Sequence, residues 1–177
     1  TNIRADGDFK AVITYDGHAV CFKEDFMHQL YNTKNPFRIT DIGAYGCINN
    51  NAVCEFDGLL AFVSPAGVML YGGGYPKCIS NCLNISDYGK SMLAAYKENL
   101  YFYSYEDNTV FVYNSVTESW GQLELSNIKA MSQNSAGAYA VTGTSLLKLN
   151  GESYGAFSFT TDSMSFGENE IKRIKGI

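Results

Sequence analysis

Short hydrophobic runs separated by tight-turn signals recur along the chain with a period of about 41 residues. The turn signals are Asp16-Gly17, Asp57-Gly58, Glu98-Asn99 and, slightly early, Ala136-Gly137. The flanking runs are rich in Val, Ile, Phe, Tyr and Leu, which favour β-strands. Asp-Gly supplies the positive φ that two-residue hairpin turns need. A repeat of about 40 residues with several strands per unit is typical of β-propeller blades.

The repeat divides into four units of about four strands each, over residues 9–42, 52–80, 92–125 and 130–160. The run Leu100–Tyr105 is bulky on both faces, as expected of a sheet packed between two others. The predicted fold class is therefore all-β: a β-propeller of about four blades of four antiparallel strands, or part of a larger propeller. The first strand of each unit would line the axis of a closed ring.

The end of the chain departs from the repeat. Residues 156–160 are expected to form the outer strand of the fourth unit. Residues 162–177 are expected to form either a closing strand or the start of a following domain. Because the chain begins with Thr1, we expect a fragment, a processed product or an excised domain.

Composition and charge limit the classes of partner that the chain is expected to bind. Aromatic residues make up 14 % of the 177 residues and charged residues 18 %, with a net charge of -5. The basic residues cluster only at Lys172, Arg173 and Lys175, so a nucleic-acid footprint is not expected. No apolar run approaches the ~18 residues that a membrane span needs. We therefore expect neither nucleic acid nor membrane as a partner.

The chain contains an odd number of cysteines at irregular spacing, which is poor evidence for a disulfide framework. They are Cys21, Cys47, Cys54, Cys78 and Cys82. Free buried cysteines behave as small hydrophobes, and this is the favoured interpretation. A disulfide, or a four-thiolate zinc site from the last four cysteines, stays open.

No catalytic constellation stands out. The two histidines, His18 and His28, are interpreted as ordinary strand residues, and nothing orients either one toward a nucleophile. The acidic pairs that could serve a glycosidase fall in turns, where such residues are expected for turn chemistry. These pairs are Glu24/Asp25, Glu106/Asp107 and Glu168/Glu170. We expect no enzyme activity, no catalytic residue, no cofactor and no metal.

Loop tyrosines are the weak candidates for ligand binding, because propeller loops gather on two rims and carry function. They are Tyr45, Tyr75, Tyr88 and Tyr154. Exposed rings would stack on sugars. The alternative is that they tuck back onto the rim.

One unit resembles a kelch-type repeat. In Thr109–Trp120 a strand ending in Tyr is followed by a short polar loop and a Trp that opens the outer strand. The double glycine of kelch repeats is absent here. Trp120 is interpreted as a packing residue between blades.

A second resemblance covers more of the chain. Gly46–Tyr71 is similar to a segment of phage and prophage virion proteins with propeller-like domains, where a Gly-Cys-Ile entry precedes a strand, Asp-Gly and an apolar strand. Phe22–Tyr31 looks like their upstream hairpin, and Thr161–Lys175 like the exit into a following β-sandwich. The chain departs from this pattern at Ala52 and Ala66, where Ser and Asp are usual.

This resemblance implies a non-enzymatic structural or assembly component of a phage or prophage particle, at the tail or head-tail junction. Such a component would be a rigid protein-interaction scaffold, with other virion proteins or its own copies as partners. It would be assembled in the bacterial cytoplasm and located in the virion. The alternative is a carbohydrate- or protein-binding propeller of the adhesin or lectin type, at the cell surface and in contact with host glycans.

Overall fold

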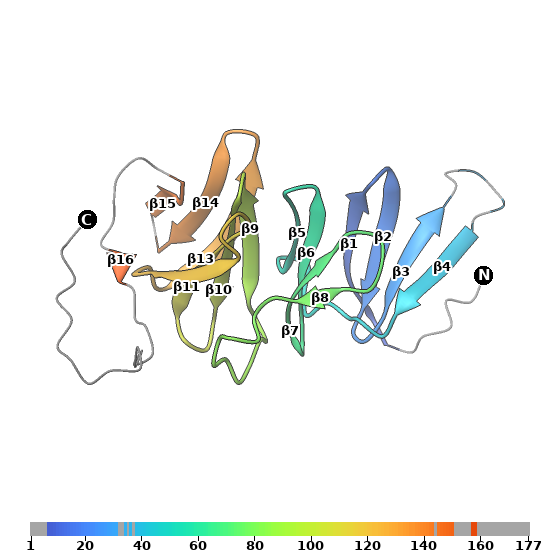
Figure 1. The fold of residues 1–177 in the computed structure, drawn as a ribbon, viewed down its shortest axis with the longest axis horizontal. Helices are drawn as coiled ribbons and strands as arrows, with labels where there is room; N and C mark the ends of the chain where they lie inside the picture. Colours follow the sequence, from blue (N-terminus) through green and yellow to red (C-terminus); the bar gives the residue numbers. More distant parts are fainter. Residues whose placement is uncertain are drawn as a thin grey trace, which may run out of the picture.

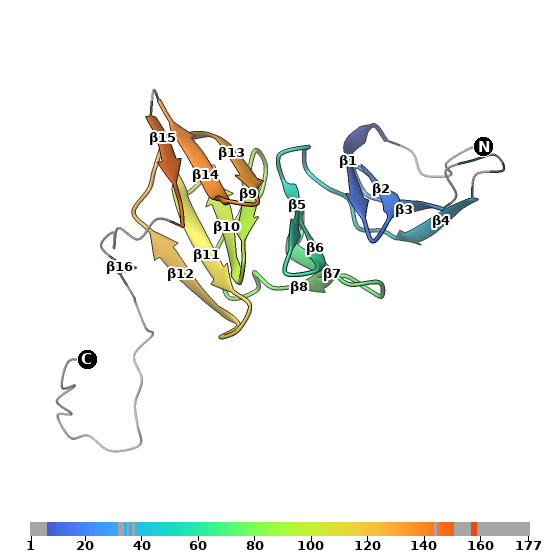
Figure 2. The ribbon, with the colours of Figure 1, turned by 90° about the horizontal axis from the view of Figure 1, so that it is seen from above.

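Four antiparallel β-sheets stand one after another in a row (Figures 1 and 2). This computed structural model describes residues 7–31, 34, 36, 38–143 and 145–150, with the backbone of 157–158. Within that part of the chain all regular structure is strand. Each sheet is built on an up-and-down meander of three or four strands in which consecutive strands pair. The all-β fold class predicted from the repeat is confirmed.

The first two sheets each contain four strands. The first sheet consists of β1 (Phe9–Tyr15), β2 (His18–Lys23), β3 (Met27–Tyr31) and β4 (Arg38–Gly43). The second consists of β5 (Val53–Phe56), β6 (Leu59–Ser64), β7 (Gly67–Tyr71) and β8 (Lys77–Cys78).

The third sheet is the largest and the fourth the smallest. The third consists of β9 (Met92–Tyr96), β10 (Asn99–Ser104), β11 (Thr109–Asn114) and β12 (Ser119–Leu123), with β16 (Phe157–Ser158) at its edge. The fourth consists of β13 (Ile128–Asn134), β14 (Gly137–Thr142) and β15 (Ser145–Lys148).

The structure differs from the sequence-based expectation at the C-terminal strand. The strand expected over 156–160 does not complete the fourth sheet, because β16 pairs with β12 through Leu123 and Gln122. The fourth sheet therefore has three strands among the described residues. The first and fourth sheets lie at opposite ends of the row, so these four sheets do not form a closed ring (Figure 2).

Alternating side chains divide the third sheet between two hydrophobic cores. In β10, Leu100 and Phe102 belong to the core shared with the second sheet, whereas Tyr101 and Tyr103 belong to the core shared with the fourth. Successive strand residues point to opposite faces, so a strand that is apolar at every position serves two neighbours. The prediction that this run lies between two sheets is confirmed for Leu100–Ser104, whereas Tyr105 follows the strand and is 51 % exposed.

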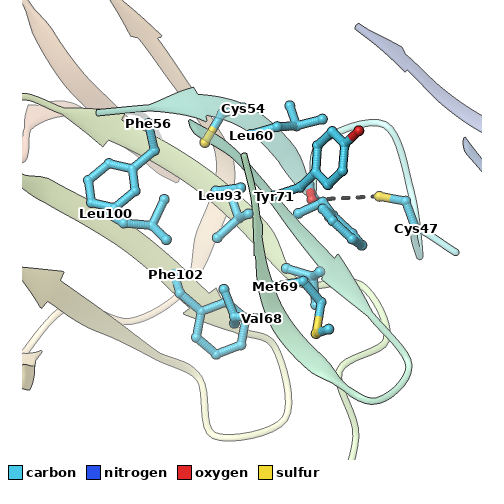
Figure 3. Packing of buried hydrophobic residues seen from close by; sticks show 14 of the residues in the cluster. Cys47, Cys54, Phe56, Leu60, Val68, Met69, Tyr71, Leu93, Leu100 and Phe102 are labelled. Carbon is cyan, nitrogen blue, oxygen red and sulfur yellow. Dashed lines mark hydrogen bonds between the residues drawn. The ribbon is translucent and has the colours of Figure 1, made fainter. Parts of the chain in front are cut away.

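The second sheet is covered on both faces in the same way. Phe62 contacts Phe22 of the first sheet, with ring centroids 4.8 Å apart. On the other face, Phe56 meets Tyr113 of the third sheet at 6.3 Å. Figure 3 shows Phe56 beside Leu100 on one side of this sheet, with Tyr71 on the other. Burying these rings is the main favourable term, at about 25 cal/mol per Å² of apolar surface.

Neighbouring sheets contact each other through their first strands. β1 contacts β5, β5 contacts β9, and β9 contacts β13. The side chain of Gln133 ties three of these strands together: its Oε1 accepts from the Ala95 N–H at 2.5 Å and its Nε2 donates to the Glu55 carbonyl at 2.9 Å. Trp120 joins the outer strands, since its indole N–H donates to the Ile79 carbonyl at 2.8 Å. The expected packing role of Trp120 between units is confirmed.

The connection between the first and second sheets explains the Gly-Cys-Ile sequence at its start. Gly46 lies so close to the β2–β3 turn that an added Cβ would stand 1.6 Å from the Glu24 carbonyl oxygen. Next to it, Cys47 is fully buried and its N–H donates to the Lys23 carbonyl at 3.1 Å. The Ile48 N–H then donates to the Val63 carbonyl of the second sheet at 3.0 Å. The connector is thus bonded to both sheets, and only glycine fits at position 46.

The substitution Gly46→Ala should lower the free energy of unfolding by about 3 kcal/mol, because the backbone of Glu24 and Asp25 must shift to admit the methyl group. Urea unfolding followed by circular dichroism measures this loss. Gly74→Ala is the matched control, since no atom lies within 4 Å of its added Cβ. Equal stability of the two variants would show that the connector does not hold the sheets together.

Candidate binding rim

One long side of the row carries a continuous set of turns and strand ends from all four sheets, here called the turn rim. The strands of each meander alternate in direction, so the turns after β1, β5, β9 and β13 lie at the same end as the C-terminal ends of β3, β7 and β11. The β5–β6 and β13–β14 turns are at the top of Figure 1. Turn residues held by packed strands present side chains at fixed positions, as functional loops do.

Local backbone geometry makes the rim turns tight. Asp16 and Gly17 have φ of 48° and 71°, and Asp57 and Gly58 have φ of 50° and 73°. Positive φ at both central residues is the pattern of a type I′ hairpin, as predicted from Asp-Gly. The third turn lies one residue earlier than predicted, at Lys97-Glu98, with Lys97 at φ 51°.

The fourth turn also lies one residue earlier, at Ser135-Ala136. Asn134 organises this turn, because its side-chain oxygen accepts from the N–H of Ala136 at 2.8 Å and of Gly137 at 3.1 Å.

Among the described residues, hollows open on the turn rim at three places. One, of about 280 Å³, lies between the first and second sheets beside Tyr15, Tyr31 and Tyr71. A second, of about 290 Å³, lies where the β5–β6, β9–β10 and β13–β14 turns meet. The largest, of about 380 Å³, lies between the second and third sheets, and we call it the Tyr75 groove.

The Tyr75 groove combines an exposed aromatic ring with charged groups. Its walls include Asp57, Tyr75, Lys77, Tyr113 and Glu118. The Tyr75 ring is 86 % exposed, whereas Tyr113 is buried against the second sheet. An exposed ring next to carboxylates and an ammonium group suits a polar ligand with an apolar face, such as a sugar or a peptide.

A hydrogen bond across the Tyr75 groove holds its two walls together. The Ser115 hydroxyl of the third sheet donates to the Asp57 carboxylate of the second at 2.8 Å. The groove is therefore a fixed feature of the inter-sheet contact.

The other predicted tyrosines do not share this groove. Tyr88 is 9 % exposed, its hydroxyl lies 3.0 Å from the Ser80 hydroxyl, and its ring packs on Phe102. Of the two interpretations left open for the loop tyrosines, Tyr88 follows the one in which the ring tucks back, because the Ser80 hydroxyl pairs with the phenol inside the core. Tyr45 is half-buried against the main core. Tyr154 lies outside the described residues.

Tyr15, Tyr31 and Tyr71 belong to the rim but were not among the predicted binding residues. Tyr15 donates to the Gly58 carbonyl of the second sheet at 3.0 Å, and its ring lies 6.0 Å from that of Tyr71. Burial raises the pKa of both phenols, so they remain protonated donors at neutral pH. The available signal is that each of these tyrosines is the last residue of its strand.

The two histidines lie on strands, as expected. His18 packs on the Tyr31 ring at 4.5 Å. His28 is 1 % exposed, with Nδ1 2.8 Å from the Asp41 carboxylate and Nε2 buried without a hydrogen-bond partner. His28 is thus closed off from substrate.

The acidic pairs considered for catalysis serve local structure where they are described. Hydrogen bonds from Ser86 and from the Asp87 N–H lower the pKa of Glu106, and the Ser104 hydroxyl donates to Asp107 at 2.6 Å. Glu168 and Glu170 lie outside the described residues. Searched over the described part of the chain, no three His, Cys, Asp or Glu residues are grouped to hold a metal ion.

All five cysteines are free thiols. Cys47 and Cys54 are buried, Cys21 and Cys78 are half-buried, and Cys82 is exposed. The favoured interpretation of buried, unbonded cysteines therefore applies to Cys47 and Cys54. The described residues include no helix long and apolar enough to cross a membrane.

Comparison with known proteins gives a likeness of fold. No protein-family model matches the chain, and no curated protein sequence matches it. The chain is similar in structure to PorZ, which is described as an essential bacterial surface component of the type-IX secretion system of Porphyromonas gingivalis. The match has a TM-score of 0.53 and 12 % sequence identity over 88 % of this chain. The chain spans 23 % of the length of that structure.

Thiol reactivity should follow burial in the sheets. Burial raises the pKa of Cys47 to about 11 and also raises that of Cys54, so both stay as unreactive thiols at pH 8. We expect iodoacetamide to modify Cys82 in the native protein and to reach Cys47 and Cys54 only after denaturation, as measured by peptide mass spectrometry. Modification of Cys54 as fast as Cys82 would contradict close packing of the second and third sheets.

Proposed function

We propose that the four sheets are consecutive blades of a β-propeller that acts as a rigid, non-enzymatic protein-interaction scaffold. The observation that carries this proposal is a repeated contact between neighbouring sheets. The last residue of each first strand faces the end of the third strand in the next sheet: Tyr15 meets Tyr71, and Phe56 meets Tyr113. Tyr96 and Leu149 flank one core in the equivalent positions. Such a repeated contact is what a constant rotation between blades would produce.

The scaffold would bind its partners through the turn rim. The hollows lie between sheets, so a partner bound there would contact two blades at once. Its fit would therefore depend on how those two blades are placed relative to each other. At 12 % identity, the likeness to PorZ supports the fold of this chain but does not support a role in secretion. The likeness of Gly46–Tyr71 to phage virion proteins supports a place in a phage or prophage particle, at the tail or head-tail junction.

Particle incorporation tests this proposal. Particles from an induced lysogen that carries the gene should be banded on a density gradient and analysed by quantitative mass spectrometry. We expect the chain to band with the intact particles at a fixed ratio to the major capsid protein. Recovery of the chain only in the soluble fraction, with a separately tagged tail protein still in the particles as the control, would refute the assignment to the virion.

A carbohydrate-binding role is the second candidate, and the exposure of Tyr75 in a groove with Asp57, Lys77 and Glu118 favours it. Loss of a stacked aromatic ring typically costs about 0.5–1.5 kcal/mol, so Tyr75→Ala should weaken glycan-array binding by about twofold to thirteenfold. Tyr105→Ala is the matched control, because Tyr105 is also exposed but does not line the groove. Equal binding by both variants, or no glycan bound by the native chain, would exclude this candidate.

A further inference from the structure

The hollow between the first and second sheets occupies the same place in its sheet pair as the Tyr75 groove does in the next pair, and we call it the Tyr31 hollow. Each lies beside the first residue of a type I′ turn, Asp16 or Asp57. Each also lies beside a tyrosine near the end of the third strand of the following sheet, Tyr71 or Tyr113. The two sites can therefore be compared position by position.

The walls of the Tyr31 hollow are polar at positions where the Tyr75 groove has leucine or glycine. The strand registers place three pairs of residues in equivalent positions: His18 for Leu59, Gln29 for Leu70 and Tyr31 for Gly72. Gln29 is only 7 % exposed. A buried carboxamide is costly where a leucine would pack, so this polar wall points to a binding role rather than to packing.

The turn carboxylate of the Tyr31 hollow differs from its counterpart in the Tyr75 groove. There, the Ser115 hydroxyl donates to Asp57 across the two sheets. The residue in the corresponding position of the Tyr31 hollow is Gly73, which supplies no hydroxyl. Asp16 is exposed, and its carboxylate can accept from a partner.

Two phenols of the Tyr31 hollow can act toward a ligand as acceptors. The Tyr15 hydroxyl donates to the Gly58 carbonyl at 3.0 Å, and the Tyr31 hydroxyl donates to Gln29 Oε1 at 3.1 Å. A phenol has a single hydrogen to donate. Both oxygens therefore have lone pairs left for a donor-rich ligand.

The charges around the Tyr31 hollow suit a cation. Burial and then the carboxylates of Asp16 and Glu55 raise the pKa of Tyr15, so the field of two negative charges reaches its phenol. The other two hollows of the rim each include an ammonium group, from Lys77 or Lys97. Among the described residues that line the Tyr31 hollow, none is a lysine or an arginine.

Aromatic rings and size narrow the cation to a single planar group. The rings of Tyr15 and Tyr71 lie 6.0 Å apart, and those of His18 and Tyr31 lie 4.5 Å apart. A guanidinium stacks on such rings while its N–H fork binds a carboxylate. The volume of about 280 Å³ lies just below the roughly 300–1,000 Å³ typical of small-molecule pockets, which suits one inserted side chain.

We propose that the Tyr31 hollow binds the guanidinium group of an arginine side chain that a partner protein presents to the turn rim. The group stacks on the Tyr31 ring and donates to the Asp16 carboxylate and to the phenol oxygens of Tyr15 and Tyr31. This inference rests on the proposed scaffold role and deepens it, because it names what one hollow between two sheets recognises.

Titration of the full chain with Nα-acetyl-arginine amide, followed by two-dimensional NMR, tests the proposal. The backbone amides of Asp16, Gly17 and Gly73 report on the hollow, and we expect them to shift and saturate. Nα-acetyl-citrulline amide is the matched probe, since it has nearly the same shape and no charge. It should bind at least about fivefold more weakly, or ~1 kcal/mol for a partly exposed ion pair.

Substitutions locate the binding. Asp16→Asn should weaken binding of the arginine probe by about fivefold and keep the turn, because asparagine also tolerates positive φ. Tyr31→Leu should weaken it by about threefold through loss of the ring. Asp57→Asn is the matched control, since Asp57 occupies the same turn position in the second sheet and does not line the hollow. It should bind as the native chain does.

Equal binding of arginine and citrulline, unchanged binding by Asp16→Asn, or no shift of these amides would overturn the proposal. A lysine amide probe that binds as tightly as arginine, or a methyl glucoside that shifts the same amides at lower concentration, would overturn the choice of a guanidinium. Banding of the chain with phage particles without arginine binding would refute this inference alone. Arginine binding by a chain that never bands with particles would refute only the assignment to the virion.

Discussion

The structure depends on apolar side chains buried face to face between successive sheets. A four-stranded meander of this size buries little surface alone, and it gains stability only when a neighbour covers its face. The second and third sheets have neighbours on both sides, and β6 and β10 accordingly have continuous runs of apolar and aromatic residues, at Leu59–Val63 and Leu100–Tyr103. Gln133, Trp120 and the connector at Cys47 add hydrogen bonds between sheets, which fix how the faces meet.

The same packing produces the candidate site. The hollows of the turn rim lie between neighbouring sheets. Of the tyrosines beside them, Tyr71 and Tyr113 are buried, and Tyr15 and Tyr31 are half-buried. Tyr75 is the exception, since its ring stands free in solvent beside the groove between the second and third sheets. The geometry of the rim is therefore set by the cores beneath it. A substitution in a core would change the positions of the rim residues.

Much of this fold is predictable from the sequence because alternation and turn chemistry are local signals. Asp-Gly at 16–17 and 57–58 marks type I′ turns that the structure contains. The third turn was displaced by one residue because Lys97 adopts positive φ without a glycine to signal it. The sequence could not decide between an exposed and a buried Tyr88, because its ring packs on Phe102 of β10 and its hydroxyl meets Ser80 eight residues earlier in the same connection. The pairing of β16 with β12 is likewise a long-range choice.

Native-state hydrogen exchange in increasing urea tests mutual support between the sheets most directly. If each sheet is held by its neighbours, the amides of β6 and β10 should exchange through one shared opening that has the highest free energy in the chain and the same dependence on urea. Separate openings for the second and third sheets, each with its own free energy and urea dependence, would contradict this account.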